Sequence, residues 1–248
     1  MKNKCPSCLG ELTLKGDHYY CPFCGESFPI AEIEKKPTAE SNPNVSNQRV
    51  DSSLPPLSGE DIYDMCIKGS VVINCRDLCC TGSGFLLDER GYVITNAHVV
   101  TDDDNEDSEN IEVVLAGRRY RAEIVCRGQA GAFDVAMLKI DPPTDGTALQ
   151  IGDSSKVRNG ETVYAIGNSL GEGLCITKGI VSDKDRPLNG FHSIMADVAT
   201  NHGNSGGPLI DADGKVIAIC VAGIDGAQGM RYFIPINEIM NAVKKYIK

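Results

Sequence analysis

Residues 203–209 read Gly-Asn-Ser-Gly-Gly-Pro-Leu, so the hydroxyl of Ser205 stands between glycines. Glycine lets the carbonyl group of a ligand approach the backbone closely. The backbone N–H groups of Gly203 and Ser205 can point at one position, and removing such a donor costs roughly 10² to 10³ in rate when charge develops on a carbonyl oxygen. The stretch predicts a serine nucleophile with an oxyanion hole formed by Gly203 and Ser205.

A serine hydroxyl is a poor nucleophile without a general base. Of the four histidines, His98 has the most suitable position, because it follows the strand-like run Tyr-Val-Ile-Thr at 92–95. Further along, Asp134 begins an apolar run, where a buried carboxylate needs a hydrogen-bond partner. We expect Ser205 to attack a carbonyl carbon, His98 to take its proton and Asp134 to hold the imidazole in the correct tautomer.

Each of these signals also has a structural interpretation. The Gly-Asn-Ser-Gly-Gly turn could be a glycine-rich hairpin, a histidine beside valines is often packed in a core, and Asp134 could begin any strand. The three residues occur in the order His98, Asp134, Ser205. Their joint occurrence favours the catalytic interpretation over three unrelated features.

Several blocks, taken in chain order, resemble the trypsin-like serine peptidases and above all the HtrA/DegP type. The resemblance covers the chain from about residue 67 to its end and rests on residues 82–87, 91–100, the run from Asp134, 166–168 and 197–209. It implies a two-barrel chymotrypsin fold and a serine endopeptidase that cleaves polypeptide substrates through an acyl-enzyme on Ser205. Members of this family often act on unfolded or damaged proteins, which suggests a role in protein quality control.

The strand pattern by itself predicts a mainly β domain with two groups of short strands, typical of barrels or sandwiches. The first group is expected at 70–75, 81–87, 92–95, 111–115, 120–126 and 134–140, and the second near 148 and at 162–166, 174–181, 194–198, 208–210, 216–222 and 231–234. In a two-barrel fold, His98 and Asp134 would come from the first barrel and Ser205 from the second. All three would then meet at the interface between the barrels.

A short helix is expected at 61–67, and the chain ends in an amphipathic helix at 237–248. Asn237 is its expected N-cap. Its apolar stripe, which we expect to pack on the core, consists of Ile236, Ile239, Met240, Val243 and Ile247.

Two Cys-x-x-Cys pairs near the N-terminus have the spacing of a tetrahedral zinc site. Their ligands would be Cys5, Cys8, Cys21 and Cys24, on either side of a hairpin that turns at 15–17. A unit this small needs a metal, disulfides or a partner to fold, so one structural zinc ion would supply its folding energy. Four thiolates leave no open position on the metal, and no cofactor is expected for catalysis. A redox pair or disulfides are the alternatives.

The chain thus divides into a zinc ribbon at 1–30, a flexible linker rich in Pro, Ser and Asn at 31–58, and a trypsin-like protease domain at 59–248. We expect no PDZ domain here, although HtrA-type proteins commonly carry one after the protease. The ribbon could bind a protein partner or mediate self-association. This leaves a rival function, a non-catalytic zinc-ribbon interaction protein that keeps the protease fold as a scaffold.

By resemblance, the pocket for the substrate side chain before the scissile bond (P1) is framed by two uncharged segments. They contain Ala199 and Thr200 before the nucleophile, and Cys220, Val221 and Ala222 on a later strand. Since none of these residues is charged, we expect a preference for small or medium aliphatic P1 residues.

The formal net charge of −10 disfavours binding to nucleic acid or to an anionic membrane. No apolar run is long enough to span a bilayer, and no apolar run follows the first lysines as in a signal peptide. Eleven cysteines without such a signal suggest a reducing compartment, and we expect a cytoplasmic location. The acidic run at 102–109 is expected to be a solvated loop, with calcium binding as the less favoured alternative.

Overall fold

The protein is described from a computed structural model, which places residues 13–16, 18–20, 27–29, 57–128, 133–143, 145–188, 191–223 and 229–247. The chain separates into two units, residues 1–53 and 54–248. The predicted linker at 31–58 lies almost wholly outside the described residues. None of the described helices is both long and apolar enough to cross a membrane.

The first unit contains a small antiparallel sheet of three strands, β1 (Thr13–Lys15), β2 (His18–Tyr20) and β3 (Ser27–Pro29). The predicted hairpin joins β1 to β2, and its turn places Gly16 at a φ of 65°. The third strand, β3, was not expected from the sequence. None of the described side chains in this unit is buried.

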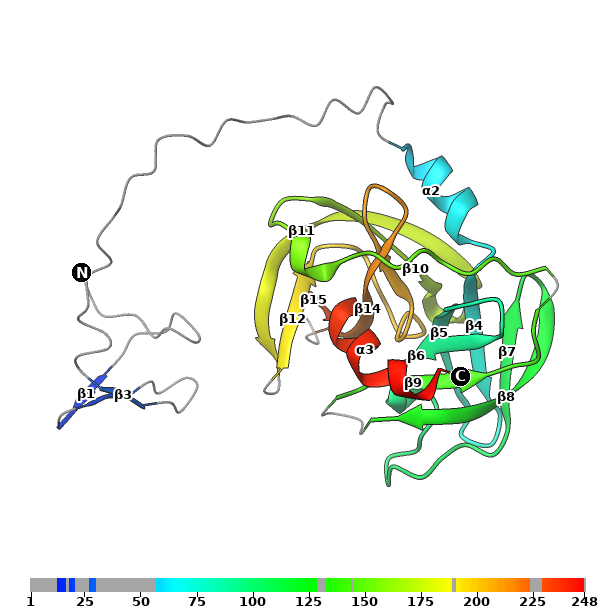
Figure 1. Ribbon diagram of the computed structural model, residues 1–248, viewed down its shortest axis with the longest axis horizontal. Coiled ribbons are helices and arrows are strands. Elements are labelled where there is room, and N and C mark those ends of the chain that lie inside the picture. The colour runs from blue at the N-terminus through cyan, green and yellow to red at the C-terminus, as the bar shows by residue number, and fades with distance from the viewer. Residues whose placement is uncertain are drawn as a thin grey trace. The chain divides into compact units, whose positions relative to one another are not determined.

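The second unit consists of two closed six-stranded barrels (Figure 1). The first barrel contains β4 (Ser70–Cys75), β5 (Cys80–Leu86), β6 (Tyr92–Thr95), β7 (Ile111–Leu115), β8 (Arg118–Arg127) and β9 (Ala136–Lys139). The second contains β10 (Thr162–Asn168), β11 (Leu174–Leu188), β12 (Phe191–Ala196), β13 (Pro208–Ile210), β14 (Val216–Gly223) and β15 (Arg231–Pro235). The predicted mainly β, two-barrel architecture is confirmed.

The two barrels share one topology. Their strand orders, β4-β5-β6-β9-β8-β7 and β10-β11-β12-β15-β14-β13, are the same when counted from the first strand of each barrel. The first strand closes each barrel by pairing with the fourth, β4 with β7 and β10 with β13. Closure leaves no open sheet edge that could pair with another chain.

Each barrel has its own core of alternating inward-facing side chains, and a further cluster joins the two. Ile73, Val93 and Leu138 lie in the first core, and Val163 and Phe233 lie in the second. The joining cluster combines buried residues from both barrels with residues of the terminal helices, among them Phe85, Met137, Ile166, Ile219 and Ile239. The interface between the barrels is therefore a packed apolar layer.

Helix α2 (Gly59–Cys66) leads into the first barrel and matches the short helix predicted near 61–67. Ser58 caps it: its hydroxyl accepts from the N–H of Asp61 at 3.1 Å, and the Asp61 carboxylate accepts from the N–H of Ser58 at 2.8 Å. Such a capping box satisfies two N–H groups that the first turn leaves unpaired. Ile62 and Cys66 bury the inner face of the helix.

Helix α3 (Ile236–Val243) is followed by a short 3-10 turn, η4 (Lys244–Tyr246). Ile236, Ile239 and Val243 are buried, as the apolar stripe predicted. The predicted N-cap is wrong, because Pro235 occupies the cap position without a side-chain bond. Asn237 lies inside the first turn, and its amide instead donates to Asp153 at 2.8 Å and accepts from the N–H of Ser154 at 3.2 Å.

Two strand predictions differ most from the structure. No strand forms near residue 148, where Ile151 makes only an isolated bridge to Val216. Strand β11 continues to Leu188, beyond the predicted end at 181, and its outer part pairs with β12. That part is charged and exposed, so it lacks the apolar alternation by which strands are recognised.

Candidate active site

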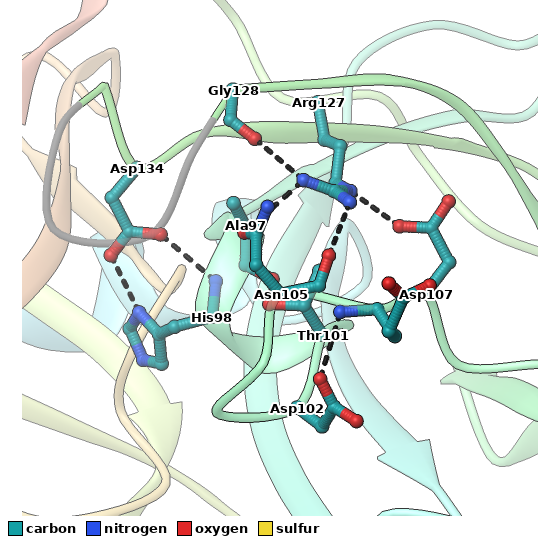
Figure 2. Close-up of polar contacts among 10 residues, drawn as sticks. Ala97, His98, Thr101, Asp102, Asn105, Asp107, Arg127, Gly128 and Asp134 are labelled. Atoms are coloured by element: carbon teal, nitrogen blue, oxygen red, sulfur yellow. Dashed lines mark hydrogen bonds and ion pairs between the residues drawn. The ribbon is translucent and has the colours of Figure 1, made fainter.

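His98 and Asp134 are joined by two hydrogen bonds (Figure 2). Asp134 Oδ2 lies 2.5 Å from His98 Nδ1, and Asp134 Oδ1 accepts from the backbone N–H of His98 at 2.9 Å. The Asp134 side chain is 7% exposed and the His98 side chain 36%. A buried carboxylate thus orients an imidazole whose other edge reaches solvent.

Strand pairing brings these two residues together. His98 lies in the 3-10 helix η1 (Ala97–Val99), which begins two residues after the end of β6, and Asp134 lies two residues before β9. β6 and β9 are antiparallel neighbours, with Thr95 opposite Ala136. Asn96 adds a tether, because its side-chain N–H donates to the carbonyl oxygen of Asp134 at 2.7 Å. Neighbouring strand ends therefore hold the base and the acid from both sides.

The loop around Ser205 is fixed by its carbonyl groups. The carbonyl of His202 accepts from Leu170 N–H at 2.7 Å, and that of Asn204 accepts from Gly207 N–H at 2.9 Å. In a trans peptide the N–H points away from the preceding carbonyl, so the N–H groups of Gly203 and Ser205 point away from these partners. Within the described part of the chain, neither N–H donates to a protein acceptor.

The glycines of this loop are required by geometry. Gly203 has a φ of 91°, and a Cβ there would lie 2.1 Å from the carbonyl oxygen of Asn168. Gly206 has a φ of 81°, and a Cβ would lie 2.3 Å from the carbonyl oxygen of Ser83. The backbone of the first barrel thus packs directly against the loop that carries Ser205.

A pocket of about 380 Å³ contains His98 and Ser205 together with Gly203. Its remaining lining comes from both barrels and consists of Cys80, Thr81, Val99, Leu170, Gly171 and His202. The structure therefore brings the predicted base, nucleophile and oxyanion residues to one cavity between the barrels, with Asp134 bonded behind His98.

The predicted P1 residues are only partly brought together. Thr200 and Cys220 are buried and adjacent, because the Thr200 side chain hydrogen-bonds the Cys220 thiol. Burial raises the pKa of the Cys220 thiol to about 11, so this wall is uncharged at neutral pH. Ala199 is exposed, Val221 is half-buried, and the side chain of Ala222 is outside the described residues. None of the four whose side chains are described lines the pocket of His98 and Ser205, and the P1 pocket stays a prediction.

Sequence reasoning missed two residues near the nucleophile. Leu170 is 67% exposed, has a φ of 57° and lines the pocket. Ser83 is fully buried, and its hydroxyl donates to the carbonyl oxygen of Gly203 at 2.6 Å. The Gly-Ser-Gly block that contains Ser83 contributed to the family resemblance, but nothing in it indicated a contact with the nucleophile loop.

The acidic run at 102–109 lies beside the candidate site, where Arg127 holds it by hydrogen bonds (Figure 2). The Arg127 guanidinium donates to the backbone carbonyl of Asn105 at 2.7 Å, to the Asn105 side chain at 3.2 Å and to the carbonyl of Gly128 at 3.1 Å, and it pairs with Asp107. Thr101 donates to the carbonyl of Ala97, next to His98, at 3.2 Å. The loop is exposed, as expected, but it is tethered to the segment that carries His98.

The predicted zinc ligands, Cys5, Cys8, Cys21 and Cys24, lie outside the described residues. Among the residues that are described, no group of three or more His, Cys, Asp or Glu side chains could hold a metal ion. The zinc site stays a prediction.

The trypsin-like peptidase domain model matches residues 82–219, more than half of the chain. A probable periplasmic DegP-like serine endoprotease of Pseudomonas putida is 40% identical over 180 residues, which cover 68% of this chain and 36% of that protein. A probable periplasmic do/HhoA-like serine protease of Haemophilus influenzae is 35% identical over 191 residues, which cover 73% of this chain and 39% of that protein. The chain thus spans little more than a third of the length of these curated relatives.

Among solved structures, the HtrA-type protease AlgW with decapeptide superposes with a TM-score of 0.67 and 28% identity, over 77% of this chain and 68% of that one. This likeness confirms the trypsin-like form of the two barrels. The predicted cytoplasmic location is wrong on these comparisons, because the relatives are named as periplasmic proteins. The matching domain and the shared fold show that the chain belongs to the trypsin-like peptidase family, with relatives of the DegP and HtrA type.

Proposed function

We propose that this chain is a serine endopeptidase of the HtrA/DegP type in which His98, Asp134 and Ser205 form the catalytic triad. The observation that carries the proposal is the double hydrogen bond from His98 to Asp134, with His98, Gly203 and Ser205 lining one pocket. A scaffold without activity has no need for a buried carboxylate that orients an imidazole beside a half-buried serine.

The hydrogen bond to Asp134 defines the role of each imidazole nitrogen. With its proton on Nδ1 and directed at Asp134 Oδ2, His98 keeps a lone pair on Nε2. Nε2 takes the proton of the Ser205 hydroxyl as its oxygen attacks the substrate carbonyl carbon, and later returns that proton to the leaving amine. Asp134 stabilises the imidazolium that forms between these steps. Water then hydrolyses the acyl-enzyme by the same route.

The free N–H groups of Gly203 and Ser205 supply the oxyanion hole. In the tetrahedral intermediate the former carbonyl oxygen bears a negative charge, which the two N–H groups stabilise by hydrogen bonds. Both are held in direction by the carbonyl contacts of His202 and Asn204 before substrate arrives. The hole therefore needs little reorganisation during the reaction.

The substrates we propose are polypeptides, with a small or medium aliphatic P1 residue. The buried, neutral Cys220 thiol and the adjacent Thr200 support an uncharged pocket. A peptide library with varied P1 residues tests this preference. A strong preference for Arg or Lys would contradict the assignment of Ala199, Thr200, Cys220, Val221 and Ala222 to the pocket.

A fluorophosphonate probe, which reacts with activated serines, tests the proposed activity. We expect it to label Ser205 in the wild-type protein and to leave Ser205→Ala unlabelled. The same change should lower kcat for a cleaved peptide by about 10⁶-fold, as for removal of a triad nucleophile. Absence of labelling in the folded wild type would favour the rival function, a partner-binding scaffold.

We also propose that the first unit is a zinc ribbon held by Cys5, Cys8, Cys21 and Cys24, which binds a protein partner or a second copy of the chain. The support is energetic: β1, β2 and β3 have three residues each, and none of their side chains is buried. Such a sheet lacks the apolar core that would stabilise it, and a metal ion would supply the missing free energy.

Metal analysis of the purified protein tests the ribbon, with one zinc ion expected per chain. Cys5→Ser should lose the metal and the β1–β3 sheet. The barrels should keep their thermal transition, because their cores consist of residues of the second unit. Cys79→Ser is the matched control, since Cys79 is an exposed thiol in the second unit. Loss of the barrel transition on zinc removal would contradict two independent modules.

The names of the relatives also support a periplasmic location for this chain.

A further inference from the structure

Two peptide groups flank Gly203, and each is held by a hydrogen bond to its carbonyl oxygen. The carbonyl of His202 accepts from Leu170 N–H at 2.7 Å, which directs the Gly203 N–H away from Leu170. The carbonyl of Gly203 accepts from the Ser83 hydroxyl at 2.6 Å. Glycine rotates freely about both of its backbone bonds, so these two contacts limit the orientation of the Gly203 N–H.

The second of these contacts comes from the other barrel. Ser83 lies on β5, is fully buried and is separated from Gly203 by 120 residues of sequence. The Ser83 hydroxyl also accepts from the N–H of Asn168, at the end of β10, at 2.8 Å. One hydroxyl therefore joins the Gly203 carbonyl to the backbone against which Gly203 packs.

The backbone of Ser83 is equally constrained. Its N–H donates to the carbonyl of Ser205 at 2.8 Å, and its carbonyl accepts from the Thr95 hydroxyl at 2.7 Å. Contacts from both sides prevent the strand from shifting to accommodate a different orientation of the loop. Ser83 thus holds two residues of the loop. Its hydroxyl holds the carbonyl of Gly203, and its backbone N–H holds the carbonyl of Ser205, the proposed nucleophile.

From this geometry we infer that Ser83 is a positioning residue for the oxyanion hole. It touches no substrate, and it acts by holding the Gly203–Asn204 peptide so that the Gly203 N–H keeps its direction. The inference rests on the proposed function, because an oxyanion hole has a role only in an acyl-transfer enzyme. Removing the hydroxyl leaves the Gly203 carbonyl and the Asn168 N–H without their partner in a buried place.

Ser83→Ala is the first test. We expect kcat to fall roughly 10- to 100-fold while KM changes little, because small displacements of a catalytic group act on the transition state more than on substrate binding. A peptide aldehyde, whose adduct with Ser205 bears the oxyanion, should lose affinity by a similar factor. The amide signal of Gly203 in an NMR spectrum of the free protein should also shift.

Ser70→Ala is the matched control. Ser70 lies on the neighbouring strand β4, is fully buried and donates to a backbone carbonyl, that of Cys66, at 3.0 Å. Both variants lose one buried hydroxyl, with two hydrogen bonds at Ser83 and one at Ser70, so both should lose thermal stability. Only Ser83→Ala should change kcat, aldehyde affinity and the Gly203 signal.

Wild-type kcat, aldehyde affinity and Gly203 signal in folded Ser83→Ala would overturn the inference. If that variant does not fold, Ser83→Cys keeps a weak donor of similar size, and intermediate values of the same three measurements are expected; wild-type values would again overturn the inference. A wild-type protein without Ser205-dependent hydrolysis would contradict the proposed function instead. The Gly203 signal still reports in that case whether Ser83 holds the loop.

Discussion

Asp134 binds His98 through both of its carboxylate oxygens, one on the ring and one on the backbone of the same residue. The backbone contact fixes where the η1 turn lies, and the ring contact fixes the rotation of the imidazole. Because both depend on one carboxylate, position and tautomer of the base are set together. A substitution that keeps the shape of Asp134 and changes only its hydrogen-bonding character can separate the two effects.

Asp134→Asn is such a substitution. The amide oxygen can still accept from the His98 N–H, but the amide N–H₂ group would donate to Nδ1 and force the ring proton onto Nε2. We expect kcat to fall by about 10⁴-fold with little loss of thermal stability, because the base then carries its proton on the wrong nitrogen. Steady-state kinetics and thermal unfolding measure the two quantities.

Asp185→Asn is the control for this change. Asp185 pairs with His192 on the surface, where their side chains are 62% and 69% exposed. The same change of an aspartate beside a histidine should leave kcat within about twofold, since exposed pairs contribute little. Equal losses in both variants would mean that the Asp134 effect is not specific to the base.

The candidate site could be predicted from sequence where local stretches carry the chemistry. His98, Asp134 and Ser205 each follow or begin a recognisable strand or glycine turn, so their residue types and their order were informative. Ser83 could not be predicted as a loop anchor, because its partner Gly203 lies far along the chain and the contact depends on how two barrels dock. Leu170 has the left-handed backbone usual for glycine, and no sequence rule indicates that conformation for leucine.

Gly203→Ala should strongly reduce the proposed peptidase activity. Alanine resists the φ of 91°, and its Cβ would lie 2.1 Å from the Asn168 carbonyl oxygen, so the loop must move. Displacing one oxyanion donor should lower kcat by at least about 10²-fold. Gly160→Ala is matched to it, because Gly160 has a φ of 87° with no atom within 4 Å of a Cβ. That variant should lose roughly 1–2 kcal/mol of stability and keep its kcat. Full activity of Gly203→Ala would contradict the role of this loop.

Arg127→Ala should release the acidic loop from the barrel. The Arg127 side chain is 21% exposed, donates hydrogen bonds to Asn105 and Gly128 and pairs with Asp107. Its removal leaves these acceptors without a charged donor. We expect a loss of about 2 kcal/mol in urea unfolding and faster hydrogen exchange at the amides of 102–106. Arg119→Ala is the control. Its side chain is 63% exposed and pairs with Glu112, so it should cost less than about 1 kcal/mol. Equal costs would mean that Arg127 is an ordinary surface charge.

Fold prediction from sequence succeeded for short strands with apolar alternation and failed where other contacts determine the structure. The bounds predicted for 70–75, 92–95, 111–115 and 208–210 are those observed. The outer half of β11 is held by pairing with β12 and not by burial, so its charged sequence resembled a loop. Asn237 has the residue type of an N-cap, but tertiary contacts with Asp153 and Ser154 use its side chain inside the helix.

Buried thiols should make the barrels sensitive to alkali. Burial raises the pKa of the Cys220 thiol from 9.0 to about 11, and Cys220 is 6% exposed. The pKa of this thiol is higher in the folded state than in the unfolded state. The neutral thiol therefore makes its full contribution to stability below about pH 9, and this contribution is lost as the pH rises toward 11. For a difference of about two pKa units the loss approaches about 3 kcal/mol.

Cys220→Ala removes this ionisation and leaves a small cavity in its place. At neutral pH the variant should be less stable than the wild type, and the difference should shrink between about pH 9 and pH 11 as only the wild type loses its thiol contribution. Urea unfolding at several pH values measures the difference. Cys79→Ala, at an exposed thiol, should track the wild type across the whole range. If the difference in stability between wild type and Cys220→Ala stayed constant with pH, ionisation of the buried thiol would not be the cause of the loss of stability at alkaline pH.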